Sequence, residues 1–329
     1  MAAEVGQLSL RERISRRTQH GDAIFWGVTL FFALVVVGLV AAIGVVTYAG
    51  SIEARAQFGL GFLGGQDWSP VDTEVAPATF GAWPAVYGTL TTSLIAVLLA
   101  GPIGAGIGIF LSELCPQRLR APLSFLVELL AAIPSVIYGL WGVAVFVPFY
   151  TQFIVTPVTS TLGQVVPAFA EPASSGGGIM GTGIVLALMI LPTVASITRD
   201  VLAVVPNTQR EVMLALGATR WEVIWQAVVP YARAGIIGGV MLGLGRALGE
   251  TMAATMIIGN STRLAPSLFD SGVTAASLVA SELPNNNGPL HSSALIYIAL
   301  VLFGITLLLN LSARLLVWQT ARGPAGARA

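Results

Sequence analysis

Six long apolar stretches constrain the fold of this 329-residue chain more than any other feature. A helix that crosses the hydrocarbon core of a bilayer needs about 20 mostly apolar residues. Six stretches meet that requirement, at residues 24–48, 85–112, 123–149, 179–205, 233–259 and 293–318. Charged residues make up only 10% of the chain, whereas soluble domains carry about 25%. The sequence therefore predicts an all-α integral membrane protein with six transmembrane helices.

The first apolar stretch follows a cluster of arginines, as the apolar part of a secretory signal peptide would. The preceding arginines are Arg11, Arg13, Arg16 and Arg17. A signal peptide has an apolar run of about 7–15 residues followed by a small-residue cleavage site. The run here is longer and has no persuasive cleavage site, so we expect a retained anchor helix.

The arginines predict the orientation of the chain, because cytoplasmic loops of membrane proteins are enriched in basic residues. One set of segments carries most of them: the N-terminus, the 113–122 loop with Arg118 and Arg120, the 199–233 segment with Arg199, Arg210, Arg220 and Arg233, and the tail with Arg314, Arg322 and Arg328. The alternate loops, 49–84, 150–178 and 260–292, hold only two of the arginines, Arg55 and Arg263, together with acidic residues Asp67, Asp72, Glu74, Glu171, Asp270 and Glu282. We therefore expect both termini in the cytoplasm and the acidic loops outside, where another protein could touch them.

Residue counts exclude several kinds of site. The formal net charge is zero, so no bulk field attracts nucleic acid. The chain has no lysine, which excludes a P-loop lysine and a Schiff-base amine. Cys115 is the single cysteine, so we expect no internal disulfide and no multi-cysteine metal site. His20 and His291 lack ligand-like neighbours in the sequence, and we interpret both as solvent or interface side chains.

The 207–230 segment predicts a helix-turn-helix elbow outside the membrane. Thr208 precedes Glu211 by three residues, and Thr219 precedes Glu222 by three. Each pair has the spacing of a capping box, in which hydroxyl and carboxylate satisfy free backbone N–H groups at a helix start. Gly217 lies between the two helices, where a left-handed residue commonly ends a helix.

The second elbow helix carries an aromatic and aliphatic stripe. Trp221, Ile224, Trp225 and Val228 recur at the spacing of one helix face, opposite Glu222 and Gln226. Such a face packs against another surface. Helix ends of the same chain, lipid headgroups and a partner protein are all open at this point.

The same segment resembles the EAA loop of ABC-importer permeases. Glu211 is followed by Gly217 six positions later and by Pro230 thirteen positions after that. The resemblance implies a coupling helix that docks on a cytoplasmic ATPase, with Glu211, Gly217, Trp221, Trp225 and Pro230 as the candidate coupling residues. The sequence departs from the EAA pattern at Val212, Met213 and Ala227, which replace other apolar residues.

Further stretches resemble the PstC family of phosphate permeases. They are ELLAAIPSVIYGLWG at 128–142, GLGRALGETMAATMIIGN at 243–260, FGAWPAVYGTL at 80–90 and FLSELCP at 110–116. This resemblance implies a type I importer permease with a MetI-like core of five helices after the anchor helix. It also implies a second, PstA-like permease, a PstB-like ATPase dimer that binds ATP and Mg²⁺, and a PstS-like phosphate-binding protein outside the cell. No cofactor is expected in this chain, which would not itself be an enzyme.

The resulting domain plan has five parts. We expect a cytoplasmic N-terminal segment at 1–23, the anchor helix at 24–48, an outer segment at 49–84, the permease domain at 85–318 and a cytoplasmic tail at 319–329.

Arg246 and Glu250 are the candidate residues of the substrate path. A charge inside a membrane span is costly and commonly faces a bundle interior or a wet cavity. If one helix covers 233–259, the two residues lie one turn apart and can pair. A structural ion pair is the alternative. Small residues at 235, 239, 243, 247 and 251 form a stripe that we interpret as a helix-packing face.

Two other functions stay open on the residues alone. One is a permease for a different oxyanion or solute in the same importer class. The other is a stand-alone secondary carrier or channel, for which the elbow would have no ATPase partner. A membrane enzyme is the least favoured class, because the sequence shows no constellation of nucleophile, base and metal ligands.

Overall fold

The computed structural model describes residues 10–70, 77–172, 176–264 and 266–321. Predictions that concern Asp72, Glu74, Arg322 and Arg328, the side chains of Arg11, Arg13, Arg16, Arg17 and His20, and most of the 319–329 tail lie outside these descriptions. The chain divides into two units, residues 1–50 and 51–329. The described residues form helices and two isolated β-bridges.

The first unit is a single helix, α1 (Leu10–Gly50). Its part from Asp22 to Gly50 has 29 residues and a mean hydropathy of 2.8, and large apolar side chains are exposed along its whole length. A helix that is apolar on all sides suits a lipid environment. The length and composition agree with the predicted anchor helix.

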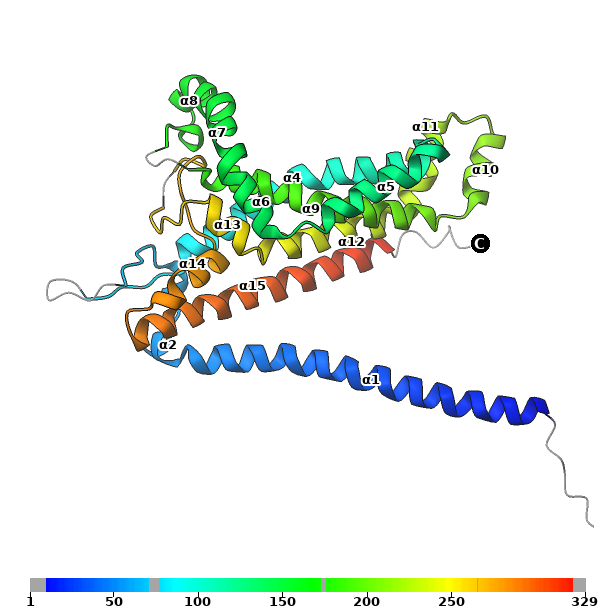
Figure 1. Cartoon of the computed structure of the whole chain (residues 1–329), viewed down its shortest axis with the longest axis horizontal. Helices are drawn as coiled ribbons and strands as arrows, with labels where there is room; N and C mark the ends of the chain where they lie inside the picture. The colour runs from blue at the N-terminus through cyan, green and yellow to red at the C-terminus, as the bar shows by residue number, and fades with distance from the viewer. Residues whose placement is uncertain (1–9, 71–76, 173–175, 265, 322–329) are drawn as a thin grey trace, which may run out of the picture. The chain divides into compact units, whose positions relative to one another are not determined.

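The second unit contains five further spans and the helices that connect them (Figure 1). Its α-helices are α2 (Ile52–Phe58), α3 (Gly61–Gly64), α4 (Trp83–Ile109), α5 (Gln117–Ala131), α6 (Ser135–Trp141), α7 (Val147–Tyr150), α8 (Thr156–Thr161), α9 (Gly178–Ala203), α10 (Asn207–Ala215), α11 (Arg220–Val223), α12 (Val229–Leu248), α13 (Met252–Ile257), α14 (Ala275–Glu282) and α15 (Pro289–Ala321). Short π-helical segments at Phe110–Leu114, Gly142–Phe146, Thr151–Val155 and Ile224–Val228 join neighbouring helices into longer spans. Short 3₁₀ turns lie at Leu162–Gln164, Pro167–Phe169 and Leu283–Asn285.

In the described part of the chain, six helical spans are long and apolar enough to cross a membrane, as the sequence predicts. They are Asp22–Gly50, Trp83–Leu114, Ser135–Gln164, Gly178–Ala203, Arg220–Leu248 and Pro289–Gln319. Four of them match the predicted stretches closely. The third and fifth do not.

The predicted third span, 123–149, is wrong in its boundaries. The helix that begins at Gln117 ends at Ala131, and a new helix begins at Ser135 and leads into a span that reaches Gln164. Pro134 explains the break, because proline lacks an N–H and disfavours helical backbone in the residue before it. Residues 123–131 therefore belong to the separate, exposed helix α5.

The predicted fifth span, 233–259, is also wrong. The span begins earlier, at Arg220, and ends at Leu248. Three residues outside the helix follow, and the short helix α13 then begins at Met252. Gly249 at the break explains part of this ending, because glycine destabilises a helix interior by about 1 kcal/mol relative to alanine.

Helix α9 is the central helix of the second unit. In the most apolar stretch of α9, 72% of the residues are buried, against 22–33% in the corresponding stretches of the other spans of this unit. On one side Gly104 and Gly108 of α4 lie against Val194 and Thr198 of α9. Small residues therefore let the two backbones approach closely.

On another side of α9, glycines of α12 make the same kind of contact. Gly235, Gly239 and Gly243 face Val201, Ile197 and Val194, respectively. Ala247 is buried in the same stripe. The packing interpretation of this stripe is confirmed up to residue 247, whereas residue 251 lies beyond the helix.

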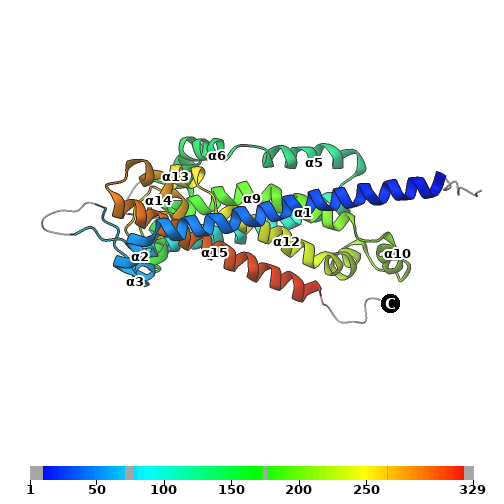
Figure 2. The ribbon, with the colours of Figure 1, turned by 90° about the horizontal axis from the view of Figure 1, so that it is seen from below.

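Different helices lie at the two ends of the second unit (Figures 1 and 2). Helices α10 and α11 lie at one end, together with the C-terminal part of α15; helices α2, α3, α13 and α14 lie at the other. The first end holds the arginine-rich 113–122 and 199–233 segments. The arginine-rich segments, which alternate with other loops along the sequence, thus lie together at one end of this unit.

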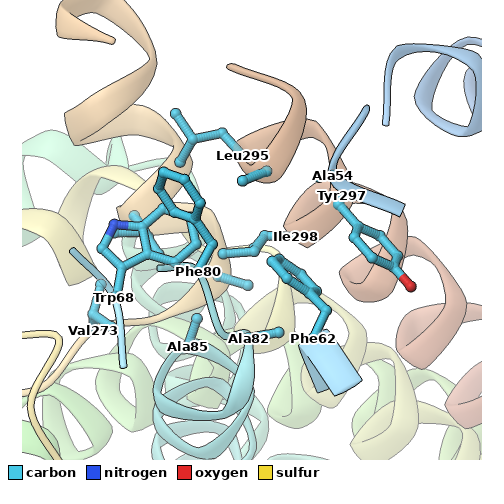
Figure 3. Close-up of a cluster of buried hydrophobic side chains, with 13 residues drawn as sticks. Ala54, Phe62, Trp68, Phe80, Ala82, Ala85, Val273, Leu295, Tyr297 and Ile298 are labelled. Atoms are coloured by element: carbon cyan, nitrogen blue, oxygen red, sulfur yellow. The ribbon is translucent and has the colours of Figure 1, made fainter. Parts of the chain in front are cut away.

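At the second end, residues 51–70 and 77–82 are fixed to α15 by an aromatic cluster (Figure 3). Phe62 stacks on Tyr297 at a centroid distance of 4.3 Å, and Trp68 packs edge-on against Phe80 at 4.9 Å. This segment therefore has its own packed core next to the N-terminal part of α15.

The interpretation of His291 as a solvent or interface residue is wrong. Its side chain is buried, and Nε2 lies 2.9 Å from Glu282 Oε2. Nδ1 accepts a hydrogen bond from the Asn287 N–H, which leaves Nε2 as the protonated nitrogen that donates to Glu282. The Trp68 indole donates to the same carboxylate oxygen at 2.8 Å.

Candidate functional site

The elbow between α9 and α12 has the predicted helix-turn-helix form. Gly217 ends α10 with a backbone φ of +86°, and no atom lies within 4 Å of the position its Cβ would take. Thr219 then starts α11 with a complete capping box: its hydroxyl accepts from the Glu222 N–H, and the Glu222 carboxylate accepts from the Thr219 N–H. Both predictions are confirmed.

The first predicted capping box is wrong. Helix α10 begins at Asn207, with Pro206 as the residue before it and no capping side chain. Thr208 therefore lies inside the helix. Pro206 sets the helix start instead, because its ring fixes the backbone at the point where the chain leaves α9.

The elbow has a buried and an exposed side. Ile224 and Val228 are buried, together with Leu202 and Val205 at the end of α9. Trp221 and Trp225 are 63% and 47% exposed, and their rings pack edge-on with centroids 5.4 Å apart. The stripe is thus not a single face.

The π-helical turn at Ile224–Val228 accounts for this division. A π-helical turn contains an extra residue, so positions spaced for one face of an α-helix rotate apart. The aliphatic pair packs inward, and the aromatic pair forms an apolar surface that the described residues leave exposed.

The other predicted coupling residues lie on the same elbow. Glu211 is an exposed residue of α10. Pro230 is at the start of α12, directly after the π-helical turn. The structure therefore brings all five candidate coupling residues into one segment at one end of the molecule.

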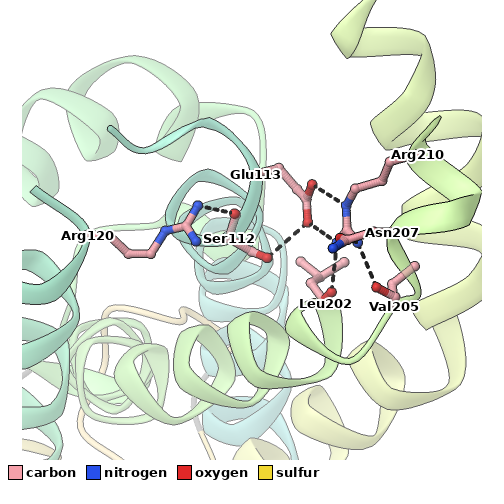
Figure 4. A network of polar contacts seen from close by, with 7 residues as sticks. All are labelled: Ser112, Glu113, Arg120, Leu202, Val205, Asn207 and Arg210. Atoms are coloured by element: carbon pink, nitrogen blue, oxygen red, sulfur yellow. Dashed lines mark hydrogen bonds and ion pairs between the residues drawn. The ribbon is translucent and has the colours of Figure 1, made fainter. Parts of the chain in front are cut away.

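The base of the elbow is held by an arginine that the sequence analysis did not single out (Figure 4). Arg210 of α10 donates from Nε to Glu113 Oε2 at 3.0 Å and from Nη2 to Glu113 Oε1 at 2.7 Å. Glu113 lies in the π-helical end of span α4. Spacing along the sequence does not reveal this pair, since 97 residues separate its members.

Arg210 also binds the end of α9. Nη1 donates to the Val205 carbonyl at 2.7 Å and to Asn207 Oδ1 at 3.3 Å, and Nη2 donates to the Leu202 carbonyl at 3.0 Å. The last carbonyls of a helix have no partner within the helix, so these bonds satisfy groups that the helix leaves free. The bonds to Glu113 are the main reason that the pKa of Arg210 is raised above its usual value.

Arg246 and Glu250 lie on opposite sides of the break in the fifth span. Arg246 is in the last turn of α12 and is exposed. Glu250 lies in the break, and its Oε1 accepts from the Ala253 N–H at 3.1 Å, at the start of α13. The two residues are not on one helix and form no ion pair, so the predicted pairing is wrong.

A metal centre is not evident in the described parts of the chain. Within residues 10–70, 77–172, 176–264 and 266–321, no three His, Cys, Asp or Glu side chains gather as metal ligands would.

Comparison with known proteins supports the predicted resemblance. The family model described as "Binding-protein-dependent transport system inner membrane component" matches residues 104–318. A curated relative, the phosphate transport system permease protein PstC of Mesorhizobium japonicum, is 44% identical over 315 residues, or 94% of each chain. The chain belongs to this permease family.

Other PstC permeases are similar over most of their length. The phosphate transport system permease protein PstC of Haemophilus influenzae is 45% identical, with 90% of this chain and 93% of the relative covered. PstC 2 of Mycobacterium tuberculosis is 42% identical, with 71% and 73% covered. The predicted PstC resemblance is confirmed.

The permease fold also agrees with a solved structure. A chain of the MetNI methionine ABC transporter in an inward-facing conformation matches with a TM-score of 0.53 and 17% identity, covering 72% of this chain and 94% of that one. The MetI-like core that the sequence predicts is thereby confirmed. As a member of this family, the chain is a multi-pass bacterial membrane protein and a permease component, not the catalytic one.

Proposed function

We propose that this chain carries inorganic phosphate across the bacterial inner membrane as one permease of an ATP-driven importer. The observation that carries the proposal is its 44% identity, over 94% of both chains, to a phosphate transport system permease. In this proposal a second permease completes the path, an ATPase dimer on the cytoplasmic side supplies energy, and an outer binding protein delivers phosphate. ATP and Mg²⁺ bind to the ATPase, and both termini of this chain face the cytoplasm.

The exposed aromatic surface of the elbow supports ATPase docking. The span that begins at Arg220 has 29 residues, which at about 1.5 Å per residue exceeds the roughly 30 Å hydrocarbon core by several residues. The elbow can therefore project from the bilayer. Trp221 and Trp225 are then exposed to water unless a partner covers them, and large aromatic side chains are common anchors in protein interfaces.

The broken fifth span supports an anion path. Arg246 lies at the end of α12 without an ion-pair partner among the described residues. Its planar guanidinium can donate two parallel hydrogen bonds to phosphate oxygens. One arginine does not neutralise a phosphate dianion, so we infer that the partner permease supplies further positive charge.

Glu250 has a different role from the one that pairing would give it. Its carboxylate accepts a hydrogen bond from the Ala253 N–H in the first turn of α13. It therefore fixes the chain direction directly after Arg246 and serves as a positioning residue for the break.

The test is phosphate uptake normalised to assembled complex. Arg246→Gln should abolish uptake of radiolabelled phosphate while the complex still assembles with its ATPase and hydrolyses ATP. Arg246→Lys should restore little, because an ammonium keeps the charge but loses the two-pronged geometry. Arg314→Gln is the matched control, since Arg314 is another exposed arginine in an apolar span, on α15. Normal normalised uptake by Arg246→Gln would show that this arginine does not carry the anion.

A further inference from the structure

The Glu113–Arg210 pair makes more hydrogen bonds than an ordinary surface ion pair. A guanidinium has five N–H donors, and five acceptors lie within hydrogen-bond distance of Arg210. Glu113 also accepts from the Ser112 hydroxyl at 3.0 Å. The side chains are only 20% and 10% exposed. The arginine is therefore held in one orientation by contacts on three sides.

These contacts join span α4 to the elbow and to the end of α9, and the backbone connects α4 directly to neither of them. The elbow is continuous with α9 before it and α12 after it, so movement of the elbow reaches those two helices through the backbone. Span α4 ends at Leu114 and continues into α5. In the described structure, its polar connection to the elbow is the pair of bonds between Glu113 and Arg210 (Figure 4).

The shape of the end of α4 places Glu113 for this contact. Residues Phe110–Leu114 form a π-helical segment, closed by the bond from the Cys115 N–H to the Phe110 carbonyl at 2.8 Å. Such segments shift the direction of the side chains that follow, and they are frequent at functional positions. Without this turn, Glu113 would lie on a different side of the helix.

Stability alone does not account well for the pair. Partly buried ion pairs are weak stabilisers on balance, because desolvation offsets much of the attraction between the charges. A two-pronged, fully bonded pair does fix distance and angle between the elements that carry it. This geometry suits a connection that must transmit displacement.

We propose that Glu113 and Arg210 form a strut that passes movement of the elbow to the inner end of span α4. The inference rests on the proposed function, in which the elbow is the surface that the ATPase moves. Both residues are positioning residues: they touch neither phosphate nor ATP. Three spans, α4, α9 and α12, then respond together when the elbow shifts.

The experiment uses the complete complex in vesicles loaded with ATP, with the binding protein and radiolabelled phosphate outside. The measured quantity is phosphate taken up per ADP formed, for wild type, Glu113→Gln and Arg210→Lys. Glutamine presents an N–H group where Arg210 needs an acceptor, and lysine cannot supply five donors in a plane. We expect uptake per ADP to fall about tenfold in both variants, because a hydrogen bond to a charged group contributes at least that factor to the state it favours.

Glu128→Gln is the matched control. Glu128 is bonded to Arg199 at 3.0 Å in α5 and α9, but it is 56% exposed and does not contact the elbow. Its uptake per ADP should equal that of wild type. The amount of ATPase that copurifies with each variant is measured in parallel.

Two results would overturn the strut. One is unchanged uptake per ADP in Glu113→Gln and Arg210→Lys beside an active wild type. The other is a loss of assembled complex with normal uptake per ADP in what remains, which would assign the pair to folding of the elbow. Failure of the wild-type complex to take up phosphate would instead refute the proposed function, so the two failures are distinguishable.

Discussion

The contact between α4 and α9 at Gly108 gives a prediction whose size follows from the geometry. A Cβ added at Gly108 would lie 2.6 Å from Thr198 Cβ and 2.8 Å from the Ala195 carbonyl oxygen, whereas ordinary contact begins at about 3.4 Å. The carbonyl belongs to the backbone of α9 and cannot rotate away. The change Gly108→Ala must therefore push the two helices apart by several tenths of an ångström.

Two opposing effects decide the outcome. Overpacking of a well-packed contact costs about 1–3 kcal/mol, and replacing glycine by alanine inside a helix contributes about 1 kcal/mol in the stabilising direction. Gly106→Ala separates the two effects, because Gly106 lies on the same helix and no atom lies within 4 Å of the position its Cβ would take. The gain from helix propensity is common to both variants. The difference between them should therefore be the overpacking cost of about 1–3 kcal/mol, with Gly108→Ala the less stable.

Thermal unfolding of the purified permease in one detergent measures this difference. At about 2–4 °C per kcal/mol, Gly108→Ala should unfold several degrees below Gly106→Ala. Gly106→Ala should match or slightly exceed wild type. Equal midpoints for the two variants would refute the reasoning that α4 and α9 are in backbone contact at Gly108.

Two further substitutions test local features. Thr219→Ala should lose the capping box, at a cost of about 1 kcal/mol, and speed amide exchange at the start of α11, whereas Thr208→Ala should leave exchange there unchanged; equal exchange in both would contradict the assignment of the cap. Tyr150→Phe should unfold at the same temperature as wild type or a higher one, because the buried Tyr150 hydroxyl has no hydrogen-bond partner among the residues that the structure describes. Tyr297→Phe is its control and should unfold lower, since the Tyr297 hydroxyl donates to the Gly59 carbonyl at 3.2 Å; the opposite order would contradict the two hydrogen-bond assignments.

The sequence predicts the number of spans and most of their positions, because length and hydropathy are local properties of each stretch. The prediction of span boundaries fails where a helix is broken within a continuous apolar stretch. Pro134 and Gly249 both stand inside apolar stretches, so hydropathy runs across them while the helix does not. Proline and glycine were the available signals, and they fix the boundaries better than the apolar count does.

The candidate sites show the same division between local and distant information. Gly217 and the Thr219 capping box depend on a few neighbouring residues, and both are confirmed. The Arg246–Glu250 pair also depends on local spacing, but only if the helix is continuous, and the break removes that condition. His291 bonds to Glu282 at the end of the preceding helix, and Arg210 bonds to Glu113, 97 residues away; spacing within one segment reveals neither contact.

The close contact at Gly108 and the Glu113–Arg210 pair lie near the same end of α4. Disrupting the first should change stability, whereas disrupting the second should change coupling. The first is an apolar contact of backbone against backbone, so its disruption changes the free energy of unfolding. The second is a polar contact, and Glu113→Gln leaves Arg210 its bonds to Val205, Asn207 and Leu202, so this change should affect coupling more than stability. If α4 follows the elbow through both contacts, Gly108→Ala should lower the unfolding temperature with the Arg210 bonds intact. Glu113→Gln should do the reverse, with nearly normal unfolding and low uptake per ADP. A permease in which α4 did not move with the elbow would show no such separation.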